Sequence, residues 1–205
     1  MSDSVKAYHG TSDLEGVTRG NAIKSPDFQQ SEDYWLVRKQ EYDVLTQKFA
    51  EAARDHIKSG FLFDGFGNDS RLLANDEALA DLVETYDIQL FNPAERIDYK
   101  ELKRTLFVYL ADQQSGSVNF ARSREEGQTG ALLEFKIPKS LLRPSFWTYR
   151  GHFTVMEVAR EVSLKFLQQI FVSTEDLARA VKLLDERGLE EVRVNEFKRN
   201  STPRQ

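Results

Sequence analysis

Helical and strand-like segments occupy different parts of this 205-residue chain, and that segregation is the strongest constraint on its fold. A short apolar alternation over residues 4–10 predicts a first strand. The stretch from 31 to 59 begins with a capping serine and acidic residues and has apolar residues at helical spacing, so it predicts a long helix. Further helices are expected over 75–86 and 98–104. This order favours an α+β fold over a doubly wound sheet.

The second half of the chain supplies most of the expected sheet. A helix-like segment over 115–124 and a capped helix over 173–188 separate its strands. We expect a single domain over 1–197, with a helical insertion over about 25–104 and a flexible basic tail over 198–205. The β-rich patterns that predict these strands cover 105–112, 131–138, 158–166, 167–173 and 190–197.

Composition excludes several kinds of site. The chain has no Cys, which rules out disulfides, thiolate nucleophiles and Cys-ligated zinc, and with three His it gives no reason to expect a metal. Its net charge of −5 gives no general attraction for phosphate backbones, although a local basic groove is compatible with it. No stretch reaches the about 18 apolar residues of a membrane span, and the first residues lack a signal-peptide core. We expect a cytoplasmic protein, or one delivered to a target cell without a cleaved signal.

Three separated motifs can be read as one set. They are "AYHGTS" with His9, "VYLAD" with Tyr109 and an aromatic Phe120 eleven positions later, and "AREVSLKFLQQIFVS" with Glu161. The set resembles the ADP-ribosyltransferase fold of the His-Tyr-Glu type, which diphtheria toxin and the poly(ADP-ribose) polymerases share. In that family a first strand ends in Tyr-His-Gly-Thr or Trp-His-Gly-Ser, and a late strand opens with the catalytic Glu. The resemblance covers the first ten or so residues and about 105–172. It implies a split β-sandwich with the helical insertion between its first two motifs.

The resemblance implies a pocket for the nicotinamide of NAD. Cleavage of the bond between nicotinamide and ribose passes through an oxocarbenium-like sugar, as glycoside hydrolysis does. Tyr109 and Phe120 are implied to sandwich the nicotinamide ring between two aromatic faces. Phe120 stands where the family more often has Tyr, so stacking is retained and a hydroxyl contact is lost. Gly10, which has no Cβ, is implied to let its backbone approach the carboxamide.

The remaining implied roles concern the sugars and the catalytic acid. His9 would hydrogen-bond ribose hydroxyls and fix the orientation of NAD, and Thr11 and Ser12 would bind the adenosine side. Glu161 would stabilise the developing positive charge and polarise the nucleophile. Glu157 competes with Glu161 for this role, and the apolar strand that follows Glu161 at the family's distance favours Glu161.

The activity expected from this resemblance is NAD-dependent mono-ADP-ribosyl transfer to a macromolecular acceptor, protein or nucleic acid, with release of nicotinamide and no metal. By analogy with the fold, the protein would be a bacterial toxin or effector. The alternatives are an NAD glycohydrolase, a non-catalytic module that binds NAD or ADP-ribose, and, more distantly, an RNA 2′-phosphotransferase. The helical insertion is expected to shape specificity or to bind a neutralising partner. Trp147, Tyr149 and Arg150 are candidate acceptor contacts that compete with a purely structural interpretation.

Overall fold

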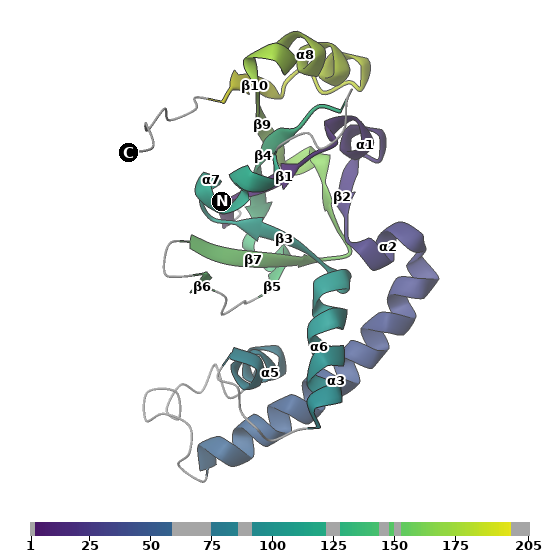
Figure 1. Cartoon of the computed structure of the whole chain (residues 1–205), viewed down its shortest axis with the longest axis vertical. Coiled ribbons are helices and arrows are strands. Elements are labelled where there is room, and N and C mark those ends of the chain that lie inside the picture. The colour runs from purple at the N-terminus through teal and green to yellow at the C-terminus, as the bar shows by residue number, and fades with distance from the viewer. Residues whose placement is uncertain are drawn as a thin grey trace.

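The computed structural model of the chain describes residues 3–58, 75–85, 92–121, 128–143, 148–149 and 153–197. Within these residues eight strands form one sheet in the order β10-β9-β4-β1-β3-β7-β5, with β6 paired to β7 (Figure 1). The pairs are antiparallel except β10 with β9. The strands are β1 (Ser4–Thr11), β3 (Phe107–Ala111), β4 (Ala131–Pro138), β5 (Leu142–Arg143), β6 (Thr148–Tyr149), β7 (Phe153–Ala159), β9 (Leu167–Val172) and β10 (Arg193–Glu196).

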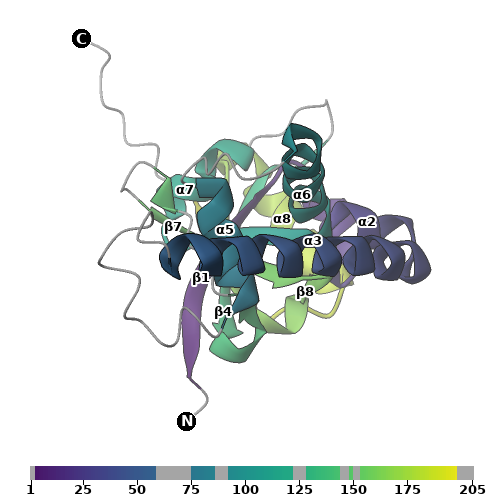
Figure 2. The same ribbon diagram turned by 90° about the horizontal axis from the view of Figure 1, so that it is seen from below.

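A second, two-stranded sheet pairs β2 (Ala22–Lys24) with β8 (Glu161–Ser163). Helices α1 (Leu14–Arg19) and α8 (Leu177–Glu186) lie at the end of the molecule that carries β9 and β10 (Figure 1). Helices α3 (Glu32–Lys58), α5 (Asp76–Thr85) and α6 (Pro93–Leu106) extend to the opposite end, and α2 (Pro26–Gln30) lies between the two ends (Figure 1). Viewed from below, α3 lies across this end of the molecule (Figure 2). Helices and strands are therefore segregated, which confirms the α+β class.

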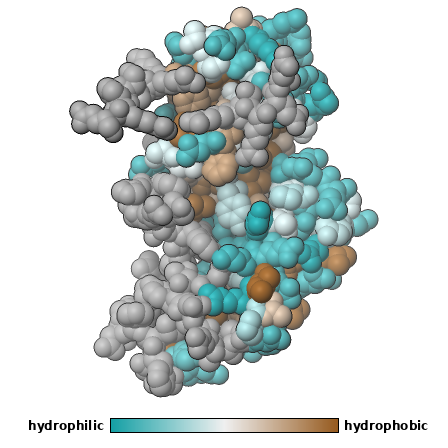
Figure 3. All heavy atoms as spheres, in the orientation of Figure 1, coloured by the Kyte–Doolittle hydropathy of each residue, from teal (hydrophilic) through white to brown (hydrophobic). Residues whose placement is uncertain are grey.

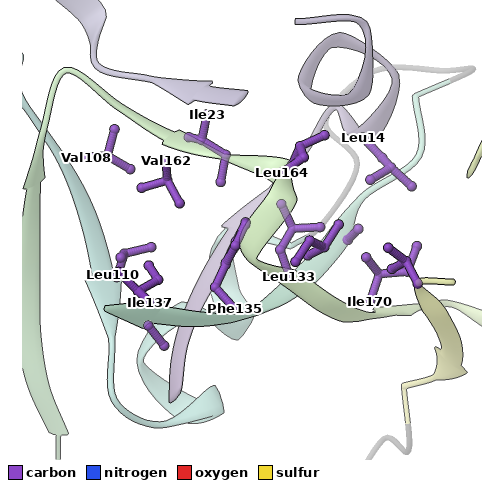
Figure 4. Close-up of a cluster of buried hydrophobic side chains, with 14 of the residues drawn as sticks. Leu14, Ile23, Val108, Leu110, Leu133, Phe135, Ile137, Val162, Leu164 and Ile170 are labelled. Atoms are coloured by element: carbon purple, nitrogen blue, oxygen red, sulfur yellow. The ribbon is translucent and has the colours of Figure 1, made fainter. Parts of the chain in front are cut away.

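Two apolar cores correspond to these two ends. The first lies between the sheet and the elements packed on it, and includes Leu14, Leu133, Phe135 and Ile170 (Figure 4). The second belongs to the helical end, where Tyr42, Phe49 and Tyr99 pack with Phe107 at the start of β3. Because Phe107 and its neighbour Val108 face different cores, β3 joins the helical end to the sheet.

Most expected elements form where the sequence places them. The Ser31 hydroxyl accepts a hydrogen bond from the backbone N–H of Tyr34 at 3.0 Å, so α3 begins as the capping signal predicts. The residue Gly188 has a φ of +68°, which suits a glycine just after α8. Helix α6 is longer than predicted, because Asn92 caps it and Pro93 occupies its first turn. The expected tail over 198–205 lies outside the described residues.

The predicted strand over 158–166 is wrong as a single element. Arg160 has a φ of +65°, which turns the chain out of the extended conformation between β7 and β8. As a result β7 stays in the large sheet while β8 pairs with β2, and residues 164–166 form a 3₁₀ turn.

Among the described helices, none is both long enough and apolar enough to cross a membrane. The 3₁₀ turns are η1 (Val118–Phe120), η2 (Lys139–Leu141), η3 (Leu164–Phe166) and η4 (Thr174–Asp176).

Candidate functional site

His9 lies where β1 separates from β3. β1 pairs with β4 along its whole length, but its register with β3 is limited to Tyr8 opposite Ala111. The His9 Nδ1 atom is 2.9 Å from the backbone oxygen of Tyr109. A carbonyl oxygen only accepts hydrogen bonds, so Nδ1 carries the proton and donates it. The His9 ring therefore links the first and second motifs directly.

The protonation state of His9, which is half-buried, follows from its partial removal from water. Removal from water lowers the pKa of His9, and the hydrogen bond to the Tyr109 carbonyl opposes this only in part. The ring is therefore neutral near pH 7, with a proton on Nδ1 and a lone pair on Nε2. In this form Nε2 can accept a hydrogen bond from a hydroxyl group, and it supplies no positive charge.

Gly10 is in contact with the short helical segment that carries Phe120. A Cβ added at Gly10 would overlap the Ser117 carbonyl oxygen and would lie 2.8 Å from Phe120 Cβ and 2.9 Å from Ala121 N. Helix α7 (Gln114–Ser117) is further tied to β1 because the Ser117 hydroxyl donates to the Tyr8 carbonyl at 2.9 Å. The space freed by the missing Cβ is thus filled by protein. A contact between the Gly10 backbone and a carboxamide stays a prediction.

The two expected stacking residues differ in how freely their rings can be approached. Phe120, in η1, is 58% exposed. Tyr109 lies on the same sheet face as Gly10, since each is two residues along its strand from the Tyr8–Ala111 pair. Its ring is half-buried against the helical core. Gly10 and Tyr109 thus lie on the face of the sheet against which Phe120 packs, where one ring is accessible and the other is partly covered.

The Tyr109 hydroxyl has a structural partner. It donates a hydrogen bond to the backbone oxygen of Lys103 at 2.8 Å. Lys103 belongs to the last turn of α6, where carbonyl groups lack partners within the helix. Leu106, the last residue of α6, has its carbonyl bonded by Trp35 Nε1 at 3.0 Å. The ring of Tyr109 is consequently held in place by the end of α6.

Thr11 and Ser12 follow Gly10 at the same end of β1. The Thr11 hydroxyl accepts a hydrogen bond from the backbone N–H of Asp13 at 3.1 Å. Asp13 in turn caps α1 by accepting from the Gly16 N–H at 2.9 Å. Both Thr11 and Ser12 are half-buried. They are placed beside His9 and Gly10 by the tight connection from β1 to α1, and their contacts with adenosine stay a prediction.

Glu161 lies apart from this group of residues. It opens β8 and is paired in register with Lys24 of β2, in the two-stranded sheet. Its side chain is exposed. Within the described part of the chain, no hydrogen bond or ion pair connects Glu161 to His9 or Tyr109. The structure thus brings the first two motifs together and leaves the expected catalytic acid on another sheet, so its catalytic role stays a prediction.

Glu157, the competing acid, lies opposite Tyr109 on β7 and is fully buried. Its carboxylate pairs with Arg143 of β5, and its Oε1 is 3.5 Å from Lys103 Nζ. Lys103 and Arg143 also pair with the buried Asp81 of α5, at 2.8 Å and 3.3 Å. Burial raises the pKa of Glu157, and the nearby Lys103 and Arg143 offset this only in part. Glu157 therefore belongs to a buried ion cluster that joins α5 and α6 to the sheet.

Sequence reasoning missed this cluster because its members come from four separate elements. The only local signal is an acidic residue within an apolar helical pattern, as Asp81 is in "ALADLV".

Of the candidate acceptor contacts, Tyr149 lies on β6 in register with Phe153, and Trp147 and Arg150 fall outside the described residues. The described residues contain no group of three or more His, Cys, Asp or Glu arranged to hold a metal ion.

Comparison with protein-family models finds no match to this chain. Curated proteins and solved structures likewise give no match. Functional assignment therefore depends on the residues and on the geometry described above.

Proposed function

We propose that this protein binds NAD where β1 and β3 separate, and that it transfers ADP-ribose to a macromolecular acceptor with release of nicotinamide. The proposed fold is a split β-sandwich of the ADP-ribosyltransferase type, with α2, α3, α5 and α6 in an insertion between its first two motifs. The limited pairing of β1 with β3 supports this proposal, since a split sheet requires these strands to diverge.

The observation that carries the proposal is the contact between the first two motifs, which lie far apart in the sequence. His9 bonds to the Tyr109 carbonyl at 2.9 Å, and Gly10 lies against the turn that carries Phe120. The sequence resemblance requires these residues to be neighbours, although residue 109 is a hundred positions from residue 9.

In the proposed reaction the nicotinamide nitrogen leaves with the electron pair of its bond to ribose C1′. A nucleophilic atom of the acceptor then forms a bond to C1′ and loses its proton. Phe120 and Tyr109 would flank the nicotinamide ring, and the neutral Nε2 of His9 would accept a hydrogen bond from a ribose hydroxyl. A carboxylate must stabilise the developing positive charge on the sugar, and Glu161 is the candidate that the resemblance supplies.

A second candidate function is suggested by the position of Glu161. Its exposed side chain on β8, in a different sheet from β3, favours a module that binds NAD or ADP-ribose without cleaving it. The buried Glu157 does not remove this alternative, since its carboxylate is engaged by Arg143 and lies beside Lys103. Binding and turnover must therefore be measured separately.

The experiment incubates the full chain with labelled NAD and a cell lysate and follows nicotinamide release and labelled acceptor. Phe120→Ala should weaken NAD binding, and the matched control is Val44→Ala, which removes another exposed apolar side chain, from α3. Glu161→Gln should lose turnover and keep binding. Binding without turnover in the wild type would favour the binding module. Absence of NAD binding by folded protein would refute both candidates.

A further inference from the structure

A second candidate surface lies on the sheet, beyond the turn that packs on Gly10. Side chains alternate between the two faces of a strand, and one face of β1, β4, β9 and β10 packs against α1 and α8 in the first core. Among the described residues, α7 and η1 pack on the opposite face over β1, and Tyr8, Leu132 and Glu134 of this face are buried. We call it the outer sheet face. Its side chains are Lys6, Tyr8, Leu132, Glu134, Lys136, Gln169, Phe171, Arg193 and Asn195, with Phe197 just after β10.

A row of polar side chains crosses this face from strand to strand. Lys6 Nζ is 3.0 Å from Glu134 Oε1, and Gln169 Nε2 donates to Glu134 Oε2 at 2.8 Å. Asn195 Nδ2 donates to Gln169 Oε1 at 3.1 Å. Burial raises the pKa of Glu134, but the hydrogen bonds from Gln169 and Lys6 outweigh this, so its pKa is lowered. The row is therefore charged and ordered, and Gln169 and Asn195 are both half-buried.

Aromatic rings lie next to this row. Phe171 and Phe197 are half-buried, with ring centroids 6.2 Å apart at an angle of 49°. They pack on Tyr8, Leu132 and Ala121 beneath them. Figure 3 shows apolar atoms at the surface around β9, in the half of the molecule opposite α3. Half-exposed rings on a sheet are suited to stack on flat ligands.

The cations of this face outnumber its carboxylates. Lys6, Lys136 and Arg193 are all exposed, and Lys6 is directly opposite Lys136 in the register of β1 with β4. Glu134 neutralises Lys6. Among the described residues, Lys136 and Arg193 form no ion pair. The outer sheet face thus has a local positive charge although the whole chain carries −5.

We propose that the outer sheet face binds single-stranded nucleic acid. Rings of the Phe171–Phe197 pair would stack on unpaired bases, while Lys136 and Arg193 contact phosphates. The amides of Gln169 and Asn195 lie between them, where they can hydrogen-bond base edges. A duplex would bind less well, because its bases are already stacked on one another. This binding needs no NAD, so it does not depend on the proposed transferase activity.

The test measures binding of a fluorescent single-stranded oligonucleotide of about 12 nucleotides to the full chain by anisotropy at low salt. The double variant Lys136→Gln/Arg193→Gln should weaken binding about tenfold or more, and should reduce the slope of log affinity against log salt by about 1.4. The matched control is Arg179→Gln/Lys182→Gln, which removes two exposed cations from α8. The control should bind as the wild type does.

A stacking variant separates nucleic-acid binding from simple charge attraction. Phe197→Ala should reduce affinity for the single strand about fivefold or more and leave the salt slope unchanged. Circular dichroism shows whether each variant is folded. If Phe197→Ala is not folded, Phe197→Leu replaces it, because leucine keeps the apolar packing and removes the aromatic ring. Three results would overturn the proposal: no binding by the wild type at low salt, equal losses in the α8 control, or tighter binding of a duplex of equal length.

Discussion

Replacement of Gly10 by Ala tests how the first motif is built. The new Cβ would overlap the Ser117 carbonyl oxygen and lie 2.9 Å from Ala121 N, and both are backbone atoms. Neither can rotate away as a flexible side chain would, so α7 and η1 must shift from β1. Overpacking of this kind costs about 1–3 kcal/mol of the free energy of unfolding. For a chain of this length that corresponds to a melting temperature lower by about 2–12 °C.

Thermal and urea unfolding followed by circular dichroism measure this effect. The matched control is Gly20→Ala, because its added Cβ would have no neighbour nearer than 3.6 Å and its φ of −83° suits any residue. We expect the control to change stability by less than about 0.5 kcal/mol. If Gly10→Ala is as stable as Gly20→Ala, then the Gly10 backbone is not packed against the Phe120 turn. In that case the central geometry of the site is wrong.

Three further predictions follow from side chains around Gly10 and β3. Tyr109→Phe keeps the ring but loses the hydrogen bond to the end of α6, so urea unfolding should show a loss of about 0.5–1.5 kcal/mol; an unchanged midpoint would contradict this cap. Lys103→Met should lower the free energy of unfolding by about 3–5 kcal/mol in the same assay, because it leaves Asp81 and Glu157 buried with one cation fewer. An unchanged free energy of unfolding would show that the cluster does not anchor α6. Partial removal from water lowers the pKa of His9, so calorimetric NAD affinity should stay level from about pH 8 to about pH 6.5 and fall only below that. A fall centred at or above about pH 6.5 would contradict a neutral His9 ring.

The sequence predicted the ends of helices well, because the signals for helix capping depend on a few neighbouring residues. Ser31 caps α3 and Gly188 follows α8, because capping depends on backbone groups within one turn. The prediction of one strand over 158–166 was wrong because the chain turns at Arg160, a residue type that seldom has positive φ. Arg160 is held there by tertiary contacts: its guanidinium lies 5.0 Å from the Trp35 ring, and its backbone carbonyl accepts from Ser25 N–H at 2.7 Å.

The candidate site was predictable in part. The contact of His9 with Tyr109 agrees with their pairing in the sequence motifs, since the two residues lie on neighbouring strands, β1 and β3. The position of Glu161 could not be foreseen, because it depends on the turn at Arg160 that sends β8 to a different sheet. The buried pairing of Glu157 with Arg143 joins residues 14 positions apart on different strands, and no local pattern reports such a contact.

The most direct test of the account is equilibrium binding of NAD to the purified full chain, measured by calorimetry for the wild type and for Phe120→Ala. The account predicts saturable binding by the wild type and a clear loss of affinity in Phe120→Ala, with Val44→Ala unchanged. Folded wild-type protein that does not bind NAD, or that binds it equally well without the Phe120 ring, would contradict the proposed site.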